Sequence, residues 1–91
     1  MTQQIRASHI LVESLDQAIA LKNDILNGSS FEDLAKENSR CPSKSLGGNL
    51  GPFGRGQMVA PFEEAAFALN VGEVSDPVQT QFGYHLIHRT G

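Results

Sequence analysis

The sequence predicts an α+β domain in which helices cover a small, mostly antiparallel sheet. Three observations lead to this prediction. Alternating apolar segments open and close the chain, at residues 5–12 and 83–90. Segments with helical spacing and capping residues lie between them. Glycines and prolines interrupt the chain between residues 42 and 56. The predicted order is a strand, two helices, a strand, a third helix and two strands.

Length, charge and composition restrict the possible functions. The chain has 91 residues, and we expect residues 1–91 to form one domain. The formal net charge is −3, whereas nucleic acids and anionic membranes require a basic face, so neither is an expected partner. The amino-terminal residues lack the pattern of a signal peptide, and the single cysteine suits a reducing compartment. We therefore expect a cytoplasmic protein, and a monomer.

The first half of the chain predicts a strand and two helices. Residues 5–12 are apolar on both faces near their end, which predicts a central strand. In the helix that follows, Ser14 and Gln17 have capping-box spacing and Gly28 lies where a helix ends. We expect its apolar stripe to consist of Leu15, Ala18, Ile19, Ile25 and Leu26, with Lys22 at its edge. Ser29 and Glu32 predict the cap of a second helix, whose apolar face contains Phe31, Leu34, Ala35 and Asn38.

The second half predicts three strands and one helix. A short strand is expected at residues 50–53, where Pro52 favours a sheet edge or a bulge. Pro61 suits the first turn of a third helix, and Pro77 marks the end or edge of another short strand. The closing strand places His85 and Ile87 on one face and Tyr84, Leu86 and His88 on the other.

Two histidines lie on strands from opposite ends of the chain. Sheet pairing could bring the imidazoles of His9 and His85 together, although a lone histidine is more often an ordinary core or surface residue. His88 points to the opposite face from His85, so these two cannot chelate one ion. We therefore expect no metal and no other cofactor.

Cys41 precedes Pro42 and allows two interpretations. Burial as an apolar thiol is the commonest fate of a free cysteine. The alternative is a thiolate activated by histidine, as in cysteine hydrolases. The sequence offers no third orienting group and no oxyanion loop, which makes the hydrolase interpretation weak.

The segment GPFGRGQMVAPF, residues 51–62, carries apolar side chains on a glycine-rich loop. Met58 precedes the third helix, and Phe62 follows four residues later. Core packing is the default for such a pair. On a loop, however, an apolar group is either a lid on the core or the wall of a pocket, and methionine with phenylalanine would fit a small apolar ring.

Five segments, in order, resemble the parvulins, a class of peptidyl-prolyl cis/trans isomerases: ASHILV, FEDLAKENSRCPS, GGNLGPFGRGQMVAPFEEAAFAL, GEVSDPV and TQFGYHLIHR. They cover nearly the whole chain. The resemblance implies a four-stranded antiparallel sheet surrounded by four helices, one of them short and near residues 42–46. It also implies rotation of X–Pro bonds in peptides or unfolded proteins, which assists folding.

The resemblance also implies the catalytic set. His9 and His85 match the family's paired histidines, and Cys41 matches a position that is Cys or Asp in parvulins. Ser39 and Thr80 match hydroxyl positions near the histidines. We expect the histidines to hold a hydrogen-bond network that tunes Cys41 beside the substrate carbonyl.

Four further matches concern substrate binding. Leu50, Met58 and Phe62 match the walls of the family's proline pocket, and Phe53 matches an aromatic residue at its rim. Phe82 departs from the family pattern, because some members have Ser there, so no polar role is expected at this position.

One parvulin subfamily requires phosphoserine or phosphothreonine before the proline and binds it with basic residues after the first strand. Here that connection is ESLDQ, residues 13–17, which contains no Lys or Arg. We therefore expect unphosphorylated substrates. The alternative function is a binding module that captures proline-containing segments with little turnover.

Overall fold

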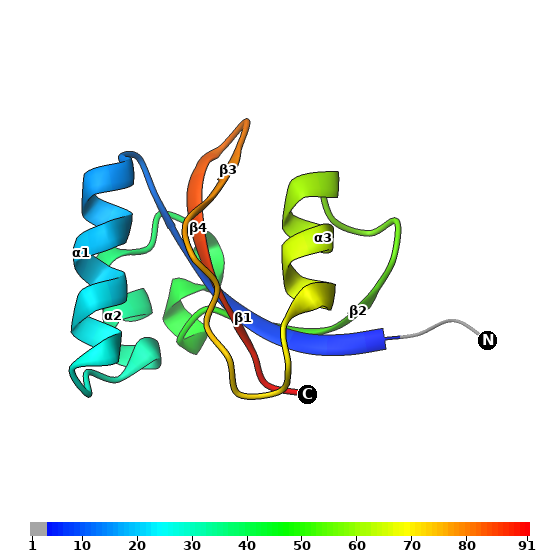
Figure 1. Cartoon of the computed structure of the whole chain (residues 1–91), viewed down its shortest axis with the longest axis horizontal. Coiled ribbons are helices and arrows are strands. Elements are labelled where there is room, and N and C mark those ends of the chain that lie inside the picture. Colours follow the sequence, from blue (N-terminus) through cyan, green and yellow to red (C-terminus); the bar gives the residue numbers. More distant parts are fainter. Residues whose placement is uncertain (1–3) are drawn as a thin grey trace.

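The computed structural model describes residues 4–91, so the first three residues of the expected domain lie outside the described part. The described elements are β1 (Gln4–Val12), α1 (Leu15–Leu26), α2 (Phe31–Asn38), the 3₁₀ helix η1 (Pro42–Leu46), β2 (Asn49–Gly54), α3 (Ala60–Ala68), β3 (Val78–Thr80) and β4 (Gly83–Arg89). They confirm the predicted α+β class, including the short helix near residues 42–46. α1 and α2 lie on one side of the sheet, and α3 lies on the other (Figure 1).

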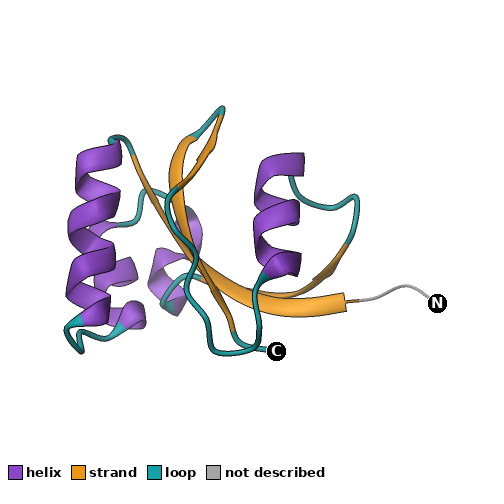
Figure 2. Cartoon of the chain, viewed as in Figure 1, coloured by secondary structure: helices purple, strands orange, loops and turns teal. Residues whose placement is uncertain are grey.

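All neighbouring strands are antiparallel, in the order β2-β1-β4-β3. The strands that open and close the chain therefore form the centre of the sheet (Figure 2). Pro52 lies in edge strand β2 and Pro77 directly precedes edge strand β3, as expected of residues that cannot donate a ladder hydrogen bond. The pairing of β1 with β2 is irregular between Arg6 and Ser8. The strand that contains Pro52 therefore lies at the sheet edge and also pairs irregularly with its neighbour.

The two faces of the central strands support separate cores. Under α1 and α2 the buried residues are Ile10, Val12, Ala18, Leu21, Phe31, Ala35 and Leu86. Under α3 they are Ile5, Ala7, Phe53, Phe62, Ala66 and Ile87. Because β1 alternates between the two cores, the face that carries Ile5 and Ala7 also carries His9 toward the α3 side.

The apolar stripe expected for α1 is partly wrong. Leu15, Ile19 and Leu26 are 43%, 44% and 72% exposed, whereas Leu21 is buried. The residues that face the core are Ala18, Leu21 and Ile25, which follow the helical spacing i, i+3, i+7. The prediction found Ala18 and Ile25 on this face, but it omitted Leu21 and added three residues that lie on other faces of the helix.

The caps of the first two helices show one agreement and one difference. Ser14 Oγ accepts a hydrogen bond from the backbone N–H of Gln17, as predicted. The cap of α2 is Ser30 and not Ser29, because Ser30 Oγ accepts from the N–H of Asp33. The sequence offers two adjacent serines, and the observed cap lies one residue after the predicted one.

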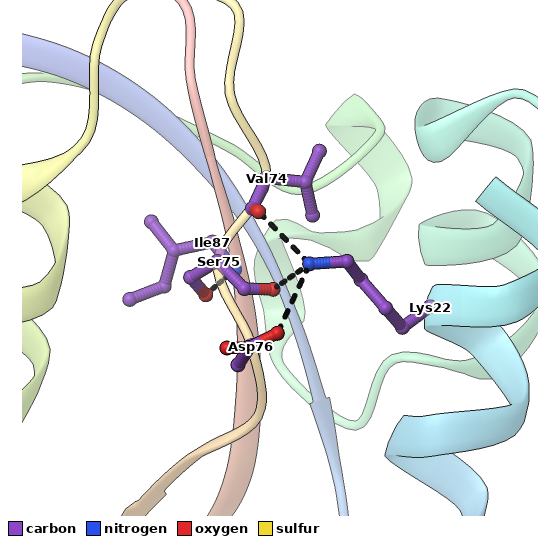
Figure 3. Close-up of polar contacts among 5 residues, drawn as sticks. All are labelled: Lys22, Val74, Ser75, Asp76 and Ile87. Carbon is purple, nitrogen blue, oxygen red and sulfur yellow. Dashed lines mark hydrogen bonds and ion pairs between the residues drawn. The ribbon is translucent and has the colours of Figure 1, made fainter. Parts of the chain in front are cut away.

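Lys22 ties α1 to the segment that leads into β3 (Figure 3). Its Nζ donates to the carbonyl oxygens of Val74 and Ser75, each at 3.0 Å, and lies 3.4 Å from the Asp76 carboxylate. Ser75 Oγ in turn accepts the N–H of Ile87 on β4 at 3.0 Å. Since the Lys22 side chain is only 17% exposed, this amine replaces water at two carbonyl groups.

Candidate active site

A pocket of about 520 Å³ opens on the α3 side of the sheet. Its walls come from β1, β4, the segment after α2, the edge strand β2, and the loop before α3. Six of the predicted site residues line it: His9, Cys41, Leu50, Met58, Phe62 and His85. Segments that are far apart in the sequence thus meet at one apolar cavity.

Several residues of this wall were not among the predicted site residues. Leu11, Arg40, Gln57 and Val59 also line the pocket. Strand alternation places Leu11 on the same face as His9, so the sequence held a signal for it. Arg40 carried no such signal, because its position depends on how the segment after α2 docks on β1.

The two histidines form a direct pair, which confirms that the sheet brings them together. His85 Nδ1 lies 3.0 Å from His9 Nδ1, and the rings are stacked at 15° with centroids 5.2 Å apart. The strand register explains this geometry. His85 pairs with Leu11 and His9 pairs with Ile87, so the histidines are diagonal neighbours on one face.

Thr80 on β3 is the diagonal neighbour of His85 and extends the contact between the two histidines to that strand. Thr80 Oγ1 lies 2.8 Å from His85 Nε2 and accepts the N–H of Phe82 at 3.2 Å. The close approach of the two Nδ1 atoms leaves room for one hydrogen between them. His9 Nε2 is buried without a hydrogen-bond partner among the described residues.

Both histidines are neutral at neutral pH. Burial lowers the pKa of His9 from 6.5 to about 4, and repulsion from His85 adds to this effect. Burial also lowers the pKa of His85. If both rings were protonated, an N–H on each Nδ1 would face the other across this contact, so the geometry and the pKa shifts agree.

Phe62 forms the floor of the pocket beneath these rings. It is 3% exposed, and its ring lies edge-on to His9 at 5.5 Å and to His85 at 5.2 Å. Met58 lies in the loop that precedes α3 and is half-buried against the same core. The Gln57 side chain holds this loop by accepting the N–H of Gly54 at 2.7 Å.

Ser39 is hydrogen-bonded to the backbone of β1 and of Cys41. Its Oγ accepts the N–H of Leu11 at 3.0 Å and that of Cys41 at 3.3 Å, and no hydrogen bond within residues 4–91 joins it to a histidine. Ser39 therefore attaches the Cys41 segment to β1. The histidine network runs to Thr80, and in the described chain no hydrogen bond connects it to the Cys41 thiol.

Phe53 does not form the rim of the pocket, which corrects the expectation. It is 2% exposed and packs beneath Phe62 and Phe67, with ring centroids 6.1 Å away in each case. Phe53 pairs with Ile5 in the sheet, and this register turns its side chain into the core under α3. Phe82 instead provides an aromatic group at the pocket mouth, where it is 60% exposed.

Gly48 explains why the turn before β2 contains glycine. Its φ is +84°, and a Cβ there would lie 2.3 Å from the carbonyl oxygen of His9. The His9 N–H donates to the Gly48 carbonyl at 3.0 Å. A side chain at this position would push β1 away at the residue that carries the imidazole.

No group of three or more potential metal ligands comes together within residues 4–91.

Comparisons with known proteins agree with this architecture. The family model "Rotamase: PPIC-type PPIASE domain" matches residues 8–91. The peptidyl-prolyl cis-trans isomerase Pin1 of Malus domestica is 46% identical over 97% of this chain and 94% of that protein. The foldase protein PrsA of Geobacillus kaustophilus is 56% identical, but the match covers 96% of this chain and only 31% of that protein.

Solved structures show the same relationship. The solution structure of NmPin, the parvulin of Nitrosopumilus maritimus, superposes with a TM-score of 0.90 and 48% identity. The match covers 100% of this chain and 99% of that one. Since sequence, fold and family model agree over nearly the whole length, the chain belongs to the parvulin, or PPIC-type, family and is a peptidyl-prolyl cis/trans isomerase.

Proposed function

We propose that this isomerase rotates X–Pro bonds in unphosphorylated protein segments and so assists folding. The proposal rests on one observation, the charge of residues 13–17, which connect β1 to α1 and form the first turn of that helix. Residues 13–17 contribute two exposed acids, Glu13 and Asp16, and no Lys or Arg. A phosphorylated residue requires charge-assisted hydrogen bonds from cations, which this connection does not offer.

The apolar pocket suits a prolyl ring. Leu50, Met58 and Phe62 supply its walls and floor, and we assign them the role of holding the ring. The neutral histidines keep this end of the pocket uncharged. A site of this kind binds an apolar ring by removing its surface from water.

Bond rotation requires no chemical bond to be made or broken. The barrier of about 18–20 kcal/mol arises from the partial double-bond character of the amide. Uncatalysed rotation takes about 10–100 s, so a rate of hundreds per second requires roughly 5–6 kcal/mol of transition-state stabilisation. Because a twisted amide is less polarised than a planar one, a dry apolar pocket favours the twisted state.

We assign Cys41 an electrostatic role beside the substrate carbonyl. Its half-buried side chain lines the pocket, where the sulfur disfavours the polarised planar amide. His9 and His85 are assigned the role of fixing the pocket end through their mutual hydrogen bond, with Thr80 as a positioning residue for His85. Ser39 positions Cys41 through the backbone of β1.

We further propose that residues 1–91 act as one domain, as a monomer in the cytoplasm. The single free cysteine supports a reducing compartment. In the part of the chain that the structure describes, no helix has the length and apolar character needed to cross a bilayer.

A pair of matched peptides tests the substrate proposal. The isomerisation rate of a phosphoserine–proline peptide is compared with that of its serine–proline counterpart by NMR exchange. We expect kcat/KM for the phosphopeptide to be equal or lower, because the acidic connection repels phosphate. A tenfold preference for the phosphopeptide would contradict the proposal.

A further inference from the structure

Arg40 introduces a charge into an otherwise neutral pocket wall. Among the described residues that line the pocket, it is the only basic side chain that is charged at neutral pH, because His9 and His85 are neutral. Its guanidinium forms an ion pair with the carboxylate of Glu13 in the acidic connection after β1. An apolar ring can bind without a charged partner. The charge of Arg40 at the pocket mouth therefore suggests contact with another part of the substrate.

The backbone brings these two residues together. The Arg40 N–H donates to the carbonyl of Leu11 at 2.8 Å, and Ser39 Oγ accepts the N–H of Leu11 at 3.0 Å. Glu13 follows Leu11 by two residues. The docking of the Arg40 segment on β1 therefore holds the backbones of the two residues close to each other.

The exposure of the pair makes it exchangeable. The side chains of Arg40 and Glu13 are 59% and 69% exposed, and an exposed pair of this kind contributes little to stability. A carboxylate on a bound peptide can therefore compete with Glu13 for the guanidinium. The arginine fork is suited to this exchange because it presents several N–H donors to a carboxylate.

Arg55, another cation on the α3 side, already contacts other groups. Its guanidinium lies 4.4 Å above the ring of Phe67 and 3.5 Å from the carboxylate of Glu63. It is also absent from the residues that line the pocket. Arg40 is thus the cation best placed to contact the substrate.

We propose that Arg40 and Glu13 form a specificity element at the pocket mouth. Arg40 is the residue that binds a carboxylate on the substrate residue adjacent to the proline. Glu13 neutralises Arg40 in the free enzyme, so that neutral segments are accepted as readily as acidic ones. This inference deepens the proposed function and rests on one part of it, the binding of the prolyl ring in this pocket.

The test uses the 91-residue chain as wild type, Glu13→Gln, Arg40→Gln and the double variant. The substrates are matched peptides with Glu or Gln immediately before the proline, and a second matched pair with the same change immediately after it. The measured quantity is the ratio of kcat/KM for the Glu peptide to that for the Gln peptide, taken within each variant. A general change in activity cancels in this ratio. Asp24→Asn removes an equal charge from the far end of α1 and serves as the control.

We expect a ratio near one for wild type and for Asp24→Asn. In Glu13→Gln the ratio should rise about two- to fivefold for at least one peptide pair, as expected for an exposed arginine–carboxylate interaction. In Arg40→Gln it should fall below the wild-type value, and in the double variant it should return toward it. High salt should remove the rise. A ratio unchanged in Glu13→Gln for both pairs would overturn the inference.

The phosphopeptide comparison separates this inference from the proposed function. If wild type prefers phosphopeptide while Glu13→Gln still shifts the ratios, the substrate proposal fails and the Arg40 site stands. If the ratios do not move, the Arg40 site fails, and the phosphopeptide result alone decides the substrate proposal.

Discussion

The buried histidine pair predicts that the protein becomes less stable as the pH falls from 7 to 5. Burial, together with repulsion from His85, lowers the pKa of His9 from 6.5 to about 4. In the unfolded chain His9 regains the ordinary value. Between these two values the unfolded state binds more protons than the folded state, so the free energy of unfolding falls as pH falls.

The magnitude follows from the two pKa values. At pH 5 an unfolded His9 is almost fully protonated, whereas the folded one is mostly neutral. The linkage relation then gives a loss of about 2 kcal/mol between pH 7 and pH 5 from His9 alone. His85 shifts in the same direction, so its contribution has the same sign. For a domain of this size, about 2 kcal/mol is a large share of the total stability.

The assay is urea unfolding at pH 5, 6 and 7. This range limits the contribution of carboxyl groups, whose ordinary pKa values lie near 4. His9→Asn replaces the titrating ring by a neutral amide, so the pH dependence should flatten by about 2 kcal/mol over this range. His88→Asn is the matched control, because His88 lies on β4 but on the face that contacts Phe31. The slope should flatten more in His9→Asn than in His88→Asn.

The result that would refute this reasoning is an equal pH dependence in wild type and His9→Asn. His9 would then titrate alike in both states, and the close contact of the two Nδ1 atoms could not be the neutral pair inferred from the structure. A lower overall stability of His9→Asn at pH 7 does not affect the test, since the test compares slopes.

Three further predictions concern the pocket, the mechanism and the hydrogen bonds that Lys22 donates. Met58→Ala should lower kcat/KM about tenfold with a small effect on melting temperature, whereas Phe53→Ala, which removes a fully buried ring outside the pocket, should cost about 3–5 kcal/mol of stability. If Met58→Ala proves the less stable of the two, Met58 is a core lid and not a pocket wall. Cys41→Asp should isomerise peptides clearly faster than Cys41→Ala, because it restores negative potential near the amide; equal background rates in two folded variants would support nucleophilic attack instead. Lys22→Met should lose about 1–3 kcal/mol in urea unfolding, because it leaves the carbonyls of residues 74 and 75 without their donor, while Lys36→Met on the exposed surface of α2 should change stability by less than about 0.5 kcal/mol. Equal losses in the two lysine variants would contradict the role assigned to Lys22.

Local sequence signals predicted the elements well where one physical cause dominates. Proline cannot donate to a strand ladder, so Pro52 and Pro77 correctly predicted the sheet edges. Alternation placed His9 and His85 on faces that could meet. The stripe of α1 failed because apolar side chains occur around most of this helix, and their size does not reveal which ones face the sheet.

The pocket was harder to predict because it depends on register and docking. A shift of one residue between β2 and β1 would turn Phe53 from the core toward solvent, and the sequence alone does not fix that register. Arg40 reaches the pocket only because Ser39 and Arg40 bind the backbone of Leu11. Contacts of this kind join residues almost thirty positions apart and leave no periodic signal.

The site combines a rigid floor with a more adjustable rim, and the two should respond differently to mutation. Phe62 is at once part of the α3 core and the surface on which both imidazoles rest, so a change there alters stability and catalysis together. Met58 and Cys41 lie on connecting segments that a few polar contacts hold in place, including those made by the Gln57 and Ser39 side chains respectively. Because the rim contributes little to the core, substitutions there can alter the substrate preference while the fold persists. Differences in specificity among related chains should therefore concentrate at the rim, and Arg40 with Glu13 lies there.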